Sequence, residues 1–362
     1  MLCWWCSLQH VCPCPNASKH NTGRYYDPGR IALDFGRIKE YAPPKKIHPS
    51  SIMSVSNTGG HGRGDQRGRI IGDVINHGKH EFWGKQNVHY HQGMAAGENT
   101  LNAVCARLVT RGITAEKGTY SNSRFLKDYV QFMTTPGSHN DTYAESFHRD
   151  FFQNWAAGIS PEKCAGKEGH NTPTIGGFVM LPPVVLASMW KGEQLMRQTV
   201  VTHLRTTHDS DLLAQRAELF ASLLSTLVKG QVPPAEAIQA AGKQLSMDLP
   251  ALVRRAAGND GAVVGRMFST ACYITDSLPS VLYLAAAHGE SFEDAVVANT
   301  NLGGENCHRG SALGAIMGAA LGESRIPKRF ITGLAASSDI KSEIDDFIAA
   351  IMAQNGATAA SL

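Results

Sequence analysis

Apolar residues recur at helical spacing along most of the chain from residue 101 onwards. In the segment 100–113, TLNAVCARLVTRGI, the residues Leu101, Val104 and Leu108 fall on one face of a helix, and Thr100 precedes it as a candidate N-cap. Comparable patterns with start or stop signals occupy 123–133, 144–158, 178–190, 210–230, 233–245, 248–258, 277–289, 291–304 and 341–356. Alternation typical of strands is scarce, so the sequence predicts an all-α fold in a single compact orthogonal helical domain.

The segment from 23 to 100 has weak apolar periodicity and is rich in glycine, histidine, asparagine and arginine. It predicts long loops with one short helix, and loops of this length in a compact protein are typically functional or disordered. His77, His80, His89 and His91 in this segment favour a polar rim. The expected organisation is a cysteine-rich leader over 1–24 and one helical domain over 25–362.

Gly310, Gly314, Gly318 and Gly322 recur every four residues, with alanines between them. Residues four apart share one face of a helix, so this face exposes almost bare backbone. Glycine is about 1 kcal/mol less favourable than alanine inside a helix, and close approach of another helix would offset that cost. We therefore expect this helix to pack side by side with the helix that begins near Thr100.

Charge and composition exclude several classes of partner. The chain has 34 basic and 31 acidic residues, a net charge of +3, and no run of lysine or arginine that would follow a phosphate backbone, so we expect no nucleic acid partner. No apolar run approaches the roughly 20 residues that span a bilayer, so we expect no membrane partner. The absence of a signal-peptide pattern and the scattered single cysteines beyond the leader favour a cytoplasmic protein.

The leader MLCWWCSLQHVCPCPNASKHNT holds Cys3, Cys6, Cys12 and Cys14. Their spacing does not match a familiar zinc-binding pattern, which favours an atypical or unstructured leader over a metal site.

Two segments contain most of the candidate functional residues. Together with two further segments, they resemble a known protein family. The first is GENTLNAVCARLV, residues 97–109, and the second is LGGENCHRGSALGAIMGAALGESRIP, residues 302–327. Together with HNTPTIGGFVMLPPVVLA at 170–187 and the Thr-His segment at 206–230, they resemble the ADP-ribosylglycohydrolase superfamily, closest in character to its J-type crystallin and selenoprotein J branch. The Gly-Asp-Ala-Leu-Gly motif usual in the first helix of that family has no counterpart before residue 40.

The resemblance implies an all-α fold with a metal site between two helix N-termini, where carboxylates hold Mg²⁺. At the matching positions this chain has Glu98 and Asn99 in the first motif, and Glu305, Cys307 and His308 in the second. The four carboxylates are thus reduced to two, and the thiol and imidazole favour zinc-like metals. The implied metal site is degenerate, and tight Mg²⁺ binding is not expected.

The resemblance also implies that an ADP-ribose-like small molecule, or an ADP-ribosylated protein, is the partner. The candidate catalytic residues are Glu98, Glu305 and His308, which could activate water or transfer protons. The phosphates would lie at the two helix N-termini, where unpaired N–H groups favour anions. The candidate substrate-binding residues are Asn99, Thr100, His139, Asn140, Asp141, Gly303, Gly304, Asn306 and Arg309, the last as a bidentate phosphate ligand.

Several alternatives stay open at this stage. A glutamate in the first turn of a helix is also explained by the helix dipole alone. In SHNDTYAESFHRDFF, the residues Asp141, Glu145 and His148 are interpreted as helix capping and surface pairing, with a wall of the active cleft as the alternative. The whole chain is predicted to be a hydrolase of an ADP-ribosyl glycosidic bond, or else a non-catalytic structural or ADP-ribose-binding protein. A nucleophilic or redox pair of Cys307 and His308 is a third possibility.

Overall fold

The computed structural model describes residues 28–44, 72–77, 79, 91–167, 169 and 173–356. The α-helices are α1 (Pro28–Phe35), α3 (Leu101–Ala115), α4 (Asn122–Thr134), α5 (Ser146–Ala156), α6 (Leu181–Ser188), α7 (Glu193–Arg205), α8 (Asp211–Lys229), α9 (Pro234–Gln244), α10 (Leu249–Ala256), α11 (Ile274–Ala287), α12 (Phe292–Asn301), α13 (Asn306–Leu321), α14 (Lys328–Thr332) and α15 (Ser337–Asn355). Short 3₁₀ helices are η4 (Pro161–Lys163), η5 (Ile175–Phe178), η6 (Met189–Lys191), η7 (Asp260–Ala262) and η8 (Glu323–Arg325). The parallel pair β1 (Gly166–Lys167) and β2 (His208–Asp209) is a minor addition. The predicted all-α fold is confirmed.

Local sequence signals set many of the helix ends. The hydroxyl of Ser210 accepts a hydrogen bond from Leu213 N at the start of α8, and Gly230 ends this helix with φ of 61°. The side chains of Ser121 and Ser291 cap α4 and α12 in the same way. Such caps satisfy N–H groups that the first helical turn leaves unpaired.

One continuous hydrophobic core joins elements from α3 to α15. It includes Ile113 of α3, Phe220 of α8, Leu284 of α11 and Phe347 of α15, all of them buried. Burial of an apolar side chain of this size contributes about 1.5–3 kcal/mol, so the packing between these helices contributes substantially to stability.

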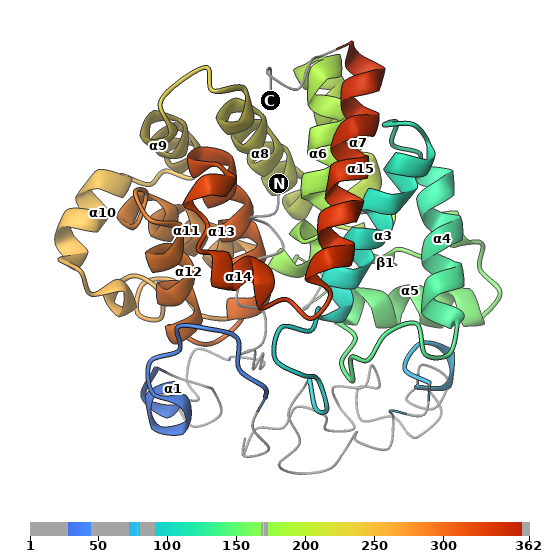
Figure 1. The fold of residues 1–362 in the computed structure, drawn as a ribbon, viewed down its shortest axis with the longest axis horizontal. Coiled ribbons are helices and arrows are strands. Elements are labelled where there is room, and N and C mark those ends of the chain that lie inside the picture. Colours follow the sequence, from blue (N-terminus) through green and yellow to red (C-terminus); the bar gives the residue numbers. More distant parts are fainter. Residues whose placement is uncertain are drawn as a thin grey trace.

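Helix α13 lies at the centre of the described fold. Its residues from Asn306 to Gly318 are all buried, because small side chains allow neighbours to approach on every face. It packs against α12, α11, α8 and η5, whereas α3 packs against α15, α4 and α6. The expectation that α13 and the helix from Thr100 pack side by side is therefore wrong, and Figure 1 shows α15 lying along α3 instead.

The N-terminal third is described only in part. Helix α1 lies in the segment where one short helix was expected, and residues 72–74 of that segment are helical as well. The chain after α1 is held to α12 by Ile38 N, which donates to Asn301 Oδ1 at 2.9 Å. The cysteine-rich leader, His80 and His89 lie outside the described residues. Within the described part of the chain, no helix is both long and apolar enough to cross a bilayer.

Candidate functional site

The second motif forms a tight loop that delivers Glu305 to the start of α13. Gly303 and Gly304 adopt φ of 71° and 60°, the left-handed region that favours glycine. A Cβ on Gly304 would collide with Thr270, whose carbonyl accepts a hydrogen bond from Glu305 N at 2.8 Å. The Gly-Gly pair is thus required by backbone geometry, and these two predicted substrate-binding residues shape the loop.

Arg309 holds this loop in place from inside the protein. Its guanidinium is fully buried and donates through Nε to Asn299 Oδ1 and through Nη2 to the Gly303 carbonyl, both at 2.8 Å. The Thr270 carbonyl accepts a further, longer bond at 3.4 Å. A guanidinium enclosed by carbonyls stabilises the loop, so we interpret Arg309 as structural and not as the expected phosphate ligand.

The imidazole of His308 and the carboxylate of Glu305 form a buried pair one helical turn apart. Nδ1 of His308 lies 2.6 Å from Oε1 of Glu305, and Glu305 has no exposed surface. Burial raises the pKa of Glu305, but the His308 imidazole and the Arg309 charge outweigh it and hold the pKa below its ordinary value. Two of the three predicted catalytic residues are therefore brought together.

A second carboxylate, that of Glu145, approaches the same imidazole from another element. Glu145 Oε1 lies 3.7 Å from His308 Nδ1, and the side chain of Glu145 is only 5% exposed. It stands at the N-cap position of α5, yet its side chain makes no capping bond there. The interpretation of Glu145 and His148 as capping and surface pairing is wrong, because both are buried against the site.

The carboxylate of Glu145 is anchored by α3 and by the glycine turn η5. Asn102 Nδ2 donates to Glu145 Oε2 at 2.6 Å, and Asn102 Oδ1 lies 3.0 Å from His148 Nε2. A Cβ on Gly176 would collide with the Glu145 carboxylate. The Gly-Gly turn at 176–177 is the signal in the sequence that could have revealed a side chain seated there.

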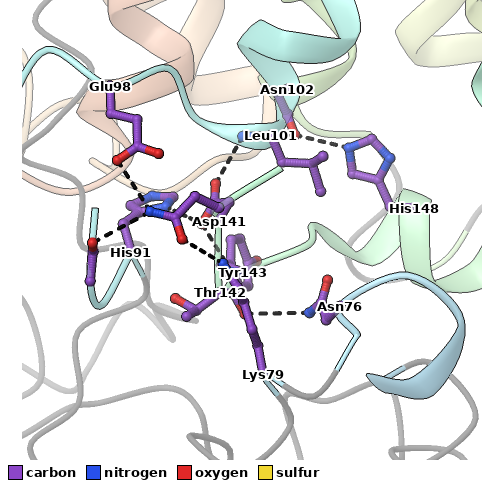
Figure 2. Close-up of polar contacts among 12 residues, drawn as sticks. Asn76, Lys79, His91, Glu98, Leu101, Asn102, Asp141, Thr142, Tyr143 and His148 are labelled. Carbon is purple, nitrogen blue, oxygen red and sulfur yellow. Dashed lines mark hydrogen bonds and ion pairs between the residues drawn. The ribbon is translucent and has the colours of Figure 1, made fainter. Parts of the chain in front are cut away.

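The start of α3 is capped by a residue 40 positions later in the chain. Asp141 Oδ2 accepts from Leu101 N at 2.9 Å, and Asp141 Oδ1 accepts from Tyr143 N at 3.0 Å and lies 2.8 Å from His91 Nδ1 (Figure 2). Burial raises the pKa of Asp141, but His91 and the two amides lower it to about 2. Thr100 occupies the N-cap position without a side-chain bond.

This arrangement corrects two expectations about the first motif. The first amide of α3 is not open to a phosphate, because an ionised carboxylate already occupies it. His91, expected at a polar rim, is buried beside Asp141.

The other predicted residues around α3 line a cleft of about 560 Å³. Glu98, Asn99, His139 and Asn140 contribute to its wall, together with Lys79 and residues before α15. Glu98 Oε2 accepts from Ala95 N at 2.9 Å and from Asn140 Nδ2 at 3.2 Å. Glu98 therefore lies in this cleft, while the two buried carboxylates beside His308 are those of Glu305 and Glu145.

Three buried oxygen atoms of the two motifs have no hydrogen-bond partner within the described part of the chain. They are Asn99 Oδ1, Thr100 Oγ1 and Asn306 Oδ1. Buried polar atoms are usually satisfied, so these oxygens are able to accept donors from a ligand.

The residues at the family's metal positions do not fit Mg²⁺ in this arrangement. Mg²⁺ binds through carboxylate oxygens in octahedral geometry, but Glu305 is paired with His308 and Glu98 with Asn140. Cys307 is buried in the first turn of α13. Among the residues that the structure describes, no three histidine, cysteine, aspartate or glutamate side chains are grouped to hold a metal.

Comparisons with known proteins agree with this fold. A solved structure titled "ADP-ribosylglycohydrolase-related protein complex" superposes with a TM-score of 0.54 at 19% sequence identity, covering 72% of this chain and 83% of that one. This similarity supports the fold alone. No curated protein sequence matches the chain significantly. The family model described as ADP-ribosylglycohydrolase matches residues 62–358, and the chain therefore belongs to the ADP-ribosylglycohydrolase family.

Proposed function

We propose that this protein hydrolyses the glycosidic bond of an ADP-ribosyl group, with Glu305 and His308 as its acid–base pair. The observation that carries the proposal is the 2.6 Å approach of His308 Nδ1 to Glu305 Oε1 at the start of α13. An imidazole with a carboxylate close to its Nδ1 can transfer a proton at its other ring nitrogen. Such transfer would protonate the leaving atom as the bond to the anomeric carbon breaks.

The proposed ligand is the ADP-ribose moiety, recognised around the first turn of α3. The unpartnered oxygens of Asn99, Thr100 and Asn306 would accept hydrogen bonds from ribose hydroxyls. Lys79, in the wall of the 560 Å³ cleft, would provide positive charge for a phosphate. We place no phosphate at the first amide of α3, since the ionised Asp141 would repel it.

A non-catalytic ADP-ribose-binding or crystallin-like protein is the second candidate. It is favoured by the loss of carboxylates at Asn99 and Cys307 and by the resemblance to the J-type crystallin and selenoprotein J branch. An ADP-ribose-binding protein of this kind would share the ligand with the hydrolase and lack turnover, whereas a crystallin-like structural protein would bind no ADP-ribose.

The experiment measures release of ADP-ribose from an ADP-ribosylated peptide, with Mg²⁺ or with EDTA, and binding of ADP-ribose by calorimetry. We expect release in both media by the wild type, and a loss of about 100-fold or more in Glu305→Gln with binding retained. Binding without release by the wild type would support the non-catalytic candidate. Release that disappears in EDTA would contradict chemistry by the protein groups alone.

A further inference from the structure

We propose that Glu145 is a catalytic residue that orients and deprotonates the attacking water, and that Asn102, His148 and Tyr129 position it. This inference rests on the proposed hydrolase function and adds the second carboxylate that hydrolysis of a glycosidic bond requires. It is carried by the juxtaposition of three elements: the end of the loop before α5, the first turn of α3, and η5.

The two carboxylates around His308 differ in how they are engaged. Glu305 Oε1 lies 2.6 Å from His308 Nδ1. Glu145 Oε2 accepts from Asn102, but Glu145 Oε1 receives no hydrogen bond from the described residues, and the imidazole Nδ1 of His308 lies 3.7 Å from it. A carboxylate oxygen that receives no hydrogen bond, on a side chain that is 5% exposed, can accept a proton from a water molecule.

A continuous chain of polar contacts fixes the other oxygen of Glu145. Tyr129 OH lies 2.5 Å from His148 Nδ1, His148 Nε2 lies 3.0 Å from Asn102 Oδ1, and Asn102 Nδ2 donates to Glu145. Burial lowers the pKa of His148 well below its ordinary value, so the ring is neutral. One assignment satisfies the whole chain: Tyr129 donates to Nδ1, and His148 donates from Nε2–H to the amide oxygen.

The Glu145 carboxylate lies directly against the backbone of Gly176. A Cβ on Gly176 would overlap it, while a Cβ on the adjacent Gly177 would instead contact His208 at 3.1 Å. The absence of a side chain at Gly176 is therefore what makes room for the Glu145 carboxylate beside His308.

The proposed step balances without a metal or an oxidant. The oxygen of water forms a bond to the anomeric carbon, and the glycosidic bond breaks with its electron pair going to the leaving atom. Glu145 takes one proton from the water, and His308 gives one proton to the leaving atom. Both groups then return to their starting states by proton exchange with solvent.

The test compares Glu145→Gln, Gly176→Ala and the matched control Gly177→Ala in the full chain, with the release and binding assays described above. We expect Glu145→Gln to lower kcat by about 100-fold or more at unchanged KM. Gly176→Ala displaces the carboxylate without changing any charge and should also lose most of kcat. Gly177→Ala should keep kcat within a few-fold of wild type.

Two further variants separate chemistry from structure. Formate added to Glu145→Ala should restore part of the release, which a purely structural role of Glu145 would not allow. Tyr129→Phe should lower kcat several-fold at unchanged KM. A Glu145→Gln variant as active as the wild type, or an absence of formate rescue in a folded Glu145→Ala, would overturn the assignment while leaving the hydrolase intact. An inactive wild type would overturn both.

Discussion

At the scale of single residues, the loop from 139 to 145 connects regions that are distant in sequence. Asp141 caps α3 and Glu145 reaches His308, although both precede α5 and were expected to serve that helix. Short polar side chains at a helix start are ordinarily explained by local capping. Here no side chain caps α5, and the two carboxylates instead contact residues of α3 and α13.

We predict that Asp141→Asn destabilises the protein by about 2 kcal/mol at pH 7, as measured by urea unfolding. The pKa of Asp141 is lowered from 3.8 to about 2 in the folded protein. Its contribution is therefore complete above about pH 5 and is lost as the pH falls toward 2, so the difference from wild type should narrow at pH 3. Asp339→Asn, an exposed position in the first turn of α15, is the matched control and should have little effect. If Asp141→Asn lowered the free energy of unfolding equally at pH 3 and pH 7, capping of α3 by an ionised Asp141 would be contradicted.

At the scale of helices, α13 explains why a glycine every four residues is tolerated. The repeat predicted close packing, which is confirmed by complete burial from Asn306 to Gly318, but the neighbours are α12, α11 and α8. Helix α3 is held from the other side by α15, where Glu343 accepts two hydrogen bonds from Arg107 at 2.8 Å. The first turns of α3 and α13 therefore contribute to the site, and the two helices do not pack along their lengths.

We predict that Gly314→Leu destabilises the protein by about 1–3 kcal/mol, because added carbon atoms would overpack a helix buried on all faces. Thermal melting of the full chain measures the effect. Ala320→Leu, near the partly exposed end of the same helix, serves as the control and should melt close to wild type. If Gly314→Leu melted at the wild-type temperature, the glycine face of α13 would be open to solvent.

At the scale of the whole molecule, one core spans the described chain from Ile75 to Ile351. Because α15 covers α3 and α13 is enclosed by α8, α11 and α12, we predict a single cooperative unfolding unit. Far-ultraviolet circular dichroism and tryptophan fluorescence should give the same transition midpoint in urea. Two separated transitions would instead divide the helical domain predicted over 25–362.

The sequence by itself determined the helical class, most helix positions and the family, and it placed the candidates Glu305 and His308 three residues apart at the start of a helix, because these depend on local periodicity. Tertiary structure decided the rest. It brought Glu145 to His308, assigned Asp141 to the start of α3, placed Glu98 in the neighbouring cleft and enclosed Arg309 among carbonyls. Apart from the contact of Arg309 with Gly303, six residues away, these contacts join segments far apart in the chain. Their geometry is set by how whole helices pack, which no local spacing of residues specifies.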